Sequence, residues 1–418
     1  MHIDNLQNRQ HGFTLVELLV GLVIGLIATL VIMQTFSSFE GNKRSTTGIS
    51  DAQTSGSIGL FMIQRELQFA GYGIPVVTGT LPEVAVNDRP YNRVYQQFTG
   101  TSQANIEAQI YAAQAAAKSA YEAKIAQNTA IVNAGENYSA LRCDPAPSLS
   151  IDLDDDPGTP AVGVNVTTPV TITENGTQDS ITIIYGDTQR GSLPSRITDT
   201  NAAIGRIAVS NNLSCREDNV ALILKDINKG VTECQAVLLK SSASGFTNAQ
   251  LDADTTTVLV DPTTIDFSKV AVGDRLACMG RIRQITFDIN NNQLRKNGQG
   301  VLDEVVSLQA QYGVSNTGNS EIVSAWANAT GAWVAPSVTD RNRIKAVRIA
   351  IIARNNLLEK NVVSQECTGA AAGPARVCVW GADSGLPAAL GANWDRYRYR
   401  VYELVVPIKN MLSASPQL

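Results

Sequence analysis

The sequence predicts an α+β fold: a long N-terminal α-helix, membrane-spanning in its first half, packed on an antiparallel β-sheet head with a large β-rich insertion. Three observations predict it, namely an apolar run near the N-terminus, a helical pattern that continues after it, and many short Val-, Ile- and Thr-rich runs further on. The chain has 418 residues and a net charge of −5. This length allows a sizeable core, and the mild acidity gives no electrostatic reason to expect a nucleic-acid partner.

The apolar run covers residues 13–33 and holds one charged residue, Glu17. A run of this length can cross a bilayer as a helix. A carboxylate inside such a helix costs about 2.5–3.5 kcal/mol on insertion scales, so we expect Glu17 to have a partner. No small-residue cleavage site follows the run, but Gly12 precedes it. Cleavage after Gly12 would make Phe13 the N-terminus, and its α-amino group could neutralise Glu17 of another subunit.

The helical pattern continues to residue 70, with Leu60, Ile63 and Leu67 at helical spacing, and Gly71, Gly73 and Pro75 end it. Four glycines in the middle section predict a soft and locally unwound stretch: Gly41, Gly48, Gly56 and Gly59.

Beyond this helix, the Ala-rich segment 104–134 predicts a second helix. Its apolar stripe is weak, which favours a surface helix over a partner-binding one. Strands are predicted at 180–186, 219–226, 256–261 and 281–289, and a hairpin turn at 290–292.

Two C-terminal runs, 344–354 and 396–408, alternate between apolar and basic residues. In the first run, Val347, Ile349 and Ile351 share one face, and Arg348 and Arg354 the other. In the second run the basic side chains are Arg396, Arg398 and Arg400. A solvated face of an antiparallel sheet explains them; the alternative is a basic strip that contacts an acidic partner or a phosphate backbone.

The six cysteines form no CxxC pair and are even in number, which favours disulfides in an oxidising compartment over a zinc site. Sequence proximity favours Cys215 with Cys234 and Cys367 with Cys378, and leaves Cys143 with Cys278. All 15 connectivities remain open on sequence grounds. Buried free thiols are the alternative.

No enzymatic site is apparent. The only histidines, His2 and His11, precede Gly12, and the chain has no phosphate-binding loop, no G-x-S-x-G and no H-E-x-x-H. One acidic cluster, Asp152, Asp154 and Asp156 with Asp155 between them, has oxygen ligands at alternate positions that suit calcium. A solvated acidic loop explains the cluster better, because Pro157 and Gly163 occupy the positions where a calcium loop needs Gly and Glu. We expect no cofactor.

The stretch Gly12-Phe13-Thr14-Leu15-Val16-Glu17, with its apolar run, resembles the processing site of type IV pilins and type II secretion pseudopilins. The resemblance implies cleavage between Gly12 and Phe13 by a prepilin peptidase, N-methylation of Phe13, and subunit docking through Phe13 and Glu17. It also implies a single-pass inner-membrane protein with a cytoplasmic leader and a periplasmic head, which later enters a pilus at the cell surface. One departure is a leader with only Arg9 as a fixed cation.

Within that superfamily the chain resembles the PilW-type minor pilins in four stretches. They are Glu66 to Tyr72 with its AGY ending, 179–185, 309–314 with 344–349, and the tail 402–410. This resemblance implies a pilin-like fold and a minor pilin that primes assembly near the pilus tip, with roles in adhesion and twitching motility. The implied partners are other minor pilins, the major pilin and a large tip adhesin; type II secretion pseudopilin and DNA-uptake pilin are the alternatives.

The expected organisation has five parts. They are the leader (1–12), the membrane half of the helix (13–36), its periplasmic half (37–72), an expanded α/β insertion (73–275) and a C-terminal antiparallel sheet (276–418).

Overall fold

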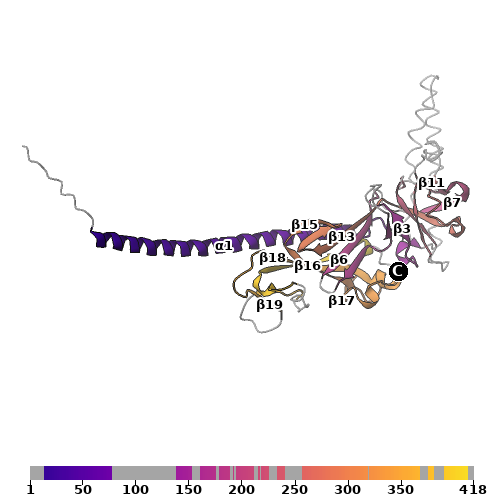
Figure 1. Ribbon diagram of the computed structural model, residues 1–418. Coiled ribbons are helices and arrows are strands. Elements are labelled where there is room, and N and C mark those ends of the chain that lie inside the picture. The colour runs from indigo at the N-terminus through magenta and orange to yellow at the C-terminus, as the bar shows by residue number, and fades with distance from the viewer. Residues whose placement is uncertain are drawn as a thin grey trace, which may run out of the picture.

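A long helix projects from one end of a β-rich head (Figure 1). The structure is a computed structural model and describes residues 14–77, 138–152, 161–175, 178–188, 192, 194–210, 215–216, 218–225, 233–240, 257–318, 320–367, 375–380 and 390–412. Several predicted features lie outside these residues: the leader, Phe13, the Ala-rich segment 104–134, and Asp154 and Asp156.

The helix α1 (Leu15–Phe69) agrees with the predicted rod to within two residues at each end. It is a single unbroken α-helix, so the predicted unwinding at the central glycines is wrong. Packing explains three of these glycines instead: Gly48, Gly56 and Gly59 are buried where the helix lies against the head. A glycine brings the helix backbone close to its neighbour, and tertiary contacts outweigh the weak helix propensity.

Two antiparallel sheets and the second half of α1 enclose the main core. The four-stranded sheet has the order β17 (Ala325–Ala327), β16 (Val305–Val314), β18 (Ile344–Arg354) and β21 (Tyr399–Pro407). The five-stranded sheet has the order β15 (Gln299–Asp303), β14 (Gln293–Lys296), β13 (Ile282–Asn290), β6 (Asp179–Gly186) and β5 (Val170–Glu174). Ile63 and Leu67 of α1 are fully buried between them, together with Phe287 and Tyr312.

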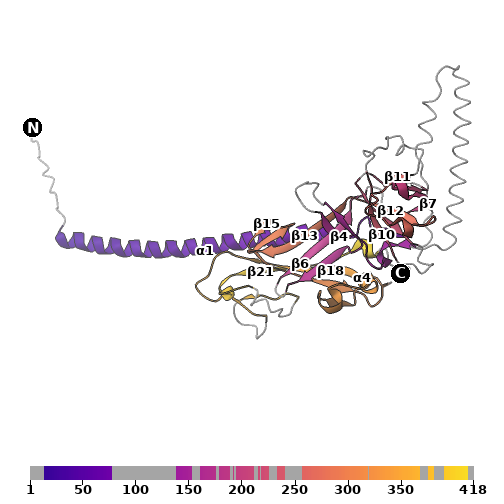
Figure 2. The ribbon, with the colours of Figure 1, turned by 45° about the vertical axis from the view of Figure 1, so that its right-hand side comes forward.

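A third, six-stranded sheet lies at the end of the head away from the projecting helix (Figure 2). Its order is β10 (Gln235–Leu238), β9 (Val220–Leu224), β12 (Arg275–Gly280), β7 (Ser195–Asn201), β8 (Arg206–Val209) and β11 (Thr257–Leu259). Both faces of its central strands are covered, because two separate apolar clusters contain alternate residues of β9 and β12.

Short elements complete the described part of the head. The two-stranded pairs are β1 (Val76–Val77) with β2 (Tyr138–Ser139), β3 (Ser148–Ile151) with β4 (Val162–Asn165), and β19 (Ser364–Gln365) with β20 (Ala375–Arg376). The short helices are η1 (Ala140–Arg142), η2 (Ala202–Ile204), η5 (Phe267–Lys269), η6 (Gly331–Trp333), α4 (Val338–Arg343), η7 (Trp394–Arg396) and α6 (Lys409–Leu412).

Strand pairing crosses the expected boundary at residue 275. Strand β13 pairs with β6, and β12 pairs with both β9 and β7. The segments 73–275 and 276–418 therefore share two sheets instead of dividing the head at this point.

The predicted hairpin at 290–292 is present. Asn290 pairs with Gln293 across a two-residue turn, and Asn291 and Asn292 have φ angles of +52° and +57°. Both angles are those of a type I′ turn, which matches the twist of the flanking strands, and asparagine tolerates them better than most residues.

Strand β18 is buried on both faces, which differs from the predicted solvated Arg face. Val347, Ile349 and Ile351 point into the main core, as their spacing predicts. On the other face, Ala350 and Ile352 pack against a cover that includes Val377, Val379 and Leu390. Sequence alternation does not reveal this cover, because it comes from a later part of the chain.

Candidate functional site

The candidate site is the N-terminal helix with its contact on the head, and it begins with Thr14 and Glu17. Thr14 is the N-cap of α1, and its hydroxyl oxygen accepts a hydrogen bond from the Glu17 backbone N–H at 3.3 Å. The Glu17 carboxylate in turn accepts from the backbone N–H and the hydroxyl of Thr14, both at 3.2 Å. This reciprocal capping box satisfies donors that a helix start leaves unpaired. The role of Thr14 is not among the sequence predictions, although the spacing Thr-x-x-Glu indicates a capping box.

The segment Leu15–Ser37 is long and apolar enough, by length and composition, to span a membrane. Its mean hydropathy is 2.8, and none of it is buried against the head. Its two threonines, Thr29 and Thr35, donate their hydroxyl hydrogens to the backbone carbonyls of Gly25 and Val31. These bonds satisfy hydroxyl donors that would be costly to leave unpaired in lipid. Nothing lies within 4 Å of the position that a Cβ would take on Gly21 or Gly25, so this face is open to a neighbouring helix.

Three glycines of α1 contact the sheets of the head. A Cβ on Gly48 would collide with the Asn355 side chain, and one on Gly56 with the Tyr402 ring. A Cβ on Gly59 would lie 3.2 Å from Leu294 and 3.3 Å from Ile351 and Leu302. The helix therefore lies directly on the side chains of β14, β15, β18 and β21. A larger residue at one of these three glycines would force the helix away from the sheets. We call this region the helix–sheet contact.

Glu66 adds a polar link between α1 and the five-stranded sheet. Its carboxylate accepts a hydrogen bond from the Tyr185 hydroxyl at 3.0 Å and forms an ion pair with Lys296 at 2.7 Å. The Glu66 side chain is only 13% exposed, so this pair is less screened than a surface one. Burial, with the Glu66 charge nearby, raises the pKa of Tyr185 to about 12, which keeps its hydroxyl a donor.

The AGY ending fixes the point where the chain leaves α1. The Ala70 carbonyl accepts a hydrogen bond from the Asn410 side chain at 2.9 Å, and the Gly71 N–H donates to Ile184 O at 3.0 Å. Gly71 has a φ angle of +73°, which favours glycine, and a Cβ there would also lie 3.2 Å from Pro169. The Tyr72 hydroxyl donates to the Thr188 carbonyl at 2.9 Å. These bonds tie the helix end to β6 and to the C-terminal helix α6.

The structure separates the three arginines of the predicted basic strip. Arg396 lies in η7 and donates from Nε to the Glu359 carbonyl at 2.8 Å, and Arg398 forms an ion pair with the Glu359 carboxylate at 2.8 Å. Only Arg400 lies within β21, where it is exposed. The row on one strand face is therefore broken, because the chain turns before Tyr399.

No group of three or more His, Cys, Asp or Glu side chains that could hold a metal ion occurs within the part of the chain that the structure describes. Of the acidic cluster, Asp152 is described and stands at the end of β3. Asp288, which alternates with two asparagines in sequence, forms an ion pair with Arg295 across the hairpin.

The structure joins Cys367 to Cys378, as sequence proximity predicts. The other two predicted pairings are wrong: Cys143 bonds to Cys234 and Cys215 to Cys278. Proximity along the sequence fails here because β12, which carries Cys278, pairs with β9, and Cys215 precedes β9 in the chain.

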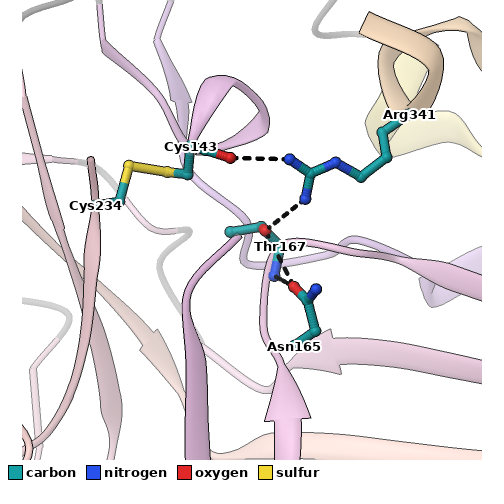
Figure 3. Close-up of a disulfide and its surroundings, with 5 residues drawn as sticks. All are labelled: Cys143, Asn165, Thr167, Cys234 and Arg341. Atoms are coloured by element: carbon teal, nitrogen blue, oxygen red, sulfur yellow. Dashed lines mark hydrogen bonds between the residues drawn. A yellow bond between two sulfur atoms is a disulfide. The ribbon is translucent and has the colours of Figure 1, made fainter. Parts of the chain in front are cut away.

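Next to the first of these disulfides lies a buried arginine (Figure 3). Arg341 of α4 donates to the Cys143 carbonyl at 2.8 Å and to the Thr167 hydroxyl at 3.2 Å, and the residue is 6% exposed. Burial lowers its pKa. Since Cys234 precedes β10 directly, the disulfide and Arg341 together connect the six-stranded sheet to the helix that precedes β18.

A continuous helix that is apolar and exposed in its first half and packed on an antiparallel head by its second half defines a pilin-like α+β protein with a β-rich extra region. Residues 7–33 match the family model of the prokaryotic N-terminal methylation motif, and residues 271–410 match that of PilW, Type IV Pilus-assembly protein W. The expected resemblance is thereby confirmed: residues 271–410 are similar to the PilW type IV pilus assembly proteins, and the N-terminus carries the methylation motif. Both models describe structural rather than catalytic proteins.

Among solved structures, the chain is similar to the Type IV-like pilin TTHA1219 from Thermus thermophilus, at 12% identity and a TM-score of 0.20. The likeness covers 47% of this chain and 87% of that one. The search of curated proteins found no match.

Proposed function

We propose that this protein is a minor pilin that primes type IV pilus assembly and sits at or near the pilus tip. The observation that carries the proposal is the bare first part of α1, where the apolar segment Leu15–Ser37 has no contact with the head. An apolar helix surface of this kind needs lipid or other helices around it. Combined with the methylation motif, it supports docking by helix packing into a filament core.

Processing would take place between Gly12 and Phe13 through a prepilin peptidase, followed by N-methylation of Phe13. Before assembly the protein would stay in the inner membrane with its head in the periplasm, and afterwards in the pilus at the cell surface. Its partners would be other minor pilins and the major pilin, with a large adhesin as a further partner at the tip.

The size of the head supports a position at the tip. The six-stranded sheet extends the head beyond the sheets that contact α1 (Figure 2). Along the shaft, a head of this size would collide with the heads of neighbouring subunits. At the tip no subunit lies above it, so there is room for it.

A deletion in the native host tests the proposal. Sheared surface pili and secreted proteins are quantified side by side, with a complemented strain as control. Loss of pili with normal secretion is the expected result. Intact pili with secreted proteins trapped in the periplasm would contradict the proposal and assign the chain to the type II secretion pseudopilins.

Replacement of Glu17 by alanine tests the docking mechanism. We expect Glu17→Ala to be cleaved normally but to enter sheared pili at least several-fold less than the wild type, because the subunit loses the carboxylate that meets the amine of another subunit. The matched control is Glu40→Ala on the same helix, outside the apolar segment, where the carboxylate forms an exposed pair with Arg44. Immunoblots of sheared filaments measure both, and normal incorporation of Glu17→Ala would show that docking does not need this carboxylate.

A further inference from the structure

With Leu15–Ser37 embedded in a bilayer, one end of the head lies close to the membrane surface, and contacts along α1 establish which end it is. Gly48 of α1 meets Asn355, which directly follows β18, while Gly59 meets Ile351 within that strand. Near the other end of α1, Ala70 bonds to Asn410, which follows β21. The chain therefore approaches the membrane along β18 and leaves it along β21. Residues 355–363 and 394–398, which flank these strands and bond to one another, lie at the end of the head nearest the apolar segment.

The distance from this end to the bilayer is short. Gly48 is eleven residues beyond Ser37, where the apolar segment ends, which corresponds to about 16 Å along a helix. The headgroup layer itself occupies about 5–8 Å on each side of the hydrocarbon. The connection also continues past Asn355 toward the membrane, because Glu359 N bonds to Arg396 O, three residues before β21, at 2.8 Å. Figure 1 shows β19, which follows this connection, at the end of the head nearest the projecting helix.

The side chains at this end are basic and apolar. We define the membrane-proximal patch as residues 40–44, 355–363 and 394–400. It contains six cations and three carboxylates, whereas the whole chain has a net charge of −5. The cations are Lys43, Arg44, Lys360, Arg396, Arg398 and Arg400. Two apolar side chains are also exposed here, Leu358 at 42% and Val362 at 51%.

We propose that the membrane-proximal patch binds the anionic headgroups of the bilayer that holds α1, so that the head rests on the membrane before assembly. Two observations favour lipid as the occupant: the patch is continuous with the membrane-spanning segment, and its excess positive charge is opposite in sign to that of anionic lipids. Cations within about a Debye length of such a surface are attracted to it, and Leu358 and Val362 can enter the headgroup layer. The inference needs only an embedded helix, so it stands or falls separately from the pilus role.

Hydrogen–deuterium exchange of the full chain in nanodiscs tests the proposal. Nanodiscs of phosphatidylcholine alone are compared with nanodiscs that also contain phosphatidylglycerol. We expect the backbone of 355–363 and 394–400 to exchange more slowly in the anionic nanodiscs, and added salt to remove the difference. Equal exchange in the two lipids would overturn the proposal.

Charge-removing variants add a matched control. The double variant Lys360→Gln, Arg400→Gln changes two exposed side chains, and we expect each lost cation to weaken the protection by roughly fivefold. The control is Lys269→Gln, Arg281→Gln, which removes two cations at 51% and 48% exposure elsewhere on the head. Equal loss of protection in both variants would contradict a specific contact between the membrane-proximal patch and the lipid. Protection by duplex DNA in detergent, with none by anionic lipid, would assign the patch to nucleic acid instead.

Discussion

Asp179 is a buried carboxylate at the seam between the two sheets of the main core. The residue is 6% exposed, and its carboxylate accepts a hydrogen bond from the Ala310 backbone N–H of β16 at 2.7 Å. Burial raises the pKa of Asp179 to about 6, against the opposing effect of that hydrogen bond. The folded protein therefore binds a proton more tightly here than the unfolded chain does.

This shift predicts a pH dependence of stability. Between the ordinary value of 3.8 and about 6 the folded state holds the proton and the unfolded state does not, so the free energy of unfolding falls as pH rises through this window. The loss is at most about 3 kcal/mol, because one pKa unit corresponds to about 1.4 kcal/mol. Asn keeps an oxygen for the Ala310 N–H, so Asp179→Asn should flatten the dependence and raise the unfolding temperature at neutral pH.

Thermal unfolding of the full chain in detergent across this pH window measures the effect. The control is Glu366→Gln, which changes an exposed carboxylate and should leave the profile of the wild type unchanged. A profile for Asp179→Asn that is as steep as that of the wild type would show that another group titrates.

At the scale of elements, local patterns predict most of what the structure shows. The ends of α1, strand β6 and the Asn291–Asn292 turn follow from apolar spacing and turn chemistry within the segment itself. The second buried face of β18, the disulfide partners of Cys143 and Cys278, and the break in the arginine strip do not. The buried face and the disulfide partners depend on segments from elsewhere in the sequence, about which local periodicity carries no information. The strip is broken because the chain forms η7 and turns before β21, which the alternation of Arg and Tyr does not reveal.

The central glycines show how the same signal can have another cause. They predict a soft helix on propensity alone, yet α1 is continuous through them because its second half is held by the helix–sheet contact. At Gly56 the Tyr402 ring occupies the place of a side chain. A glycine in a helix therefore indicates either low helix stability or close packing. The surface that faces the glycine decides which of the two applies.

We predict that Gly56→Leu lowers the free energy of unfolding of the head by about 1–3 kcal/mol, or more, because the new side chain must displace Tyr402. The control is Ser57→Leu, which introduces the same residue at the neighbouring exposed position. Thermal unfolding and the rate of proteolysis of the head report the difference. Equal stability of the two variants would mean that α1 does not need close contact at Gly56.

For the whole molecule, the main question is how the six-stranded sheet is held on the remaining head. Strand β12 leads directly into β13, so the chain passes from that sheet to the five-stranded one. A second connection is made by the Cys143–Cys234 disulfide and the buried guanidinium of Arg341 (Figure 3). A side-chain connection at a place separate from this strand restricts rotation of the sheet more than the strand alone can.

Arg341→Lys tests the second connection. A lysine keeps the charge but lacks the planar fork that reaches both Cys143 O and the Thr167 hydroxyl, so we expect a loss of about 1–3 kcal/mol in unfolding free energy. Hydrogen exchange of β9 and β10 should become faster than that of β16 and β18. The control is Arg65→Lys on the exposed surface of α1. Unchanged exchange in β9 and β10 would assign the connection to the disulfide and the strand alone.

The alignment of α1 with the strands beneath it has a mechanical consequence. The helix runs along β21 in the same direction and along β18 in the opposite one, from Gly48 at Asn355 to Ala70 at Asn410. Tension that enters through the first half of α1 therefore acts parallel to these strands. It loads the nine-residue register between β18 and β21 in shear, so that its hydrogen bonds must fail together rather than one after another. A head mounted in this way resists pulling along the helix far better than pulling across it.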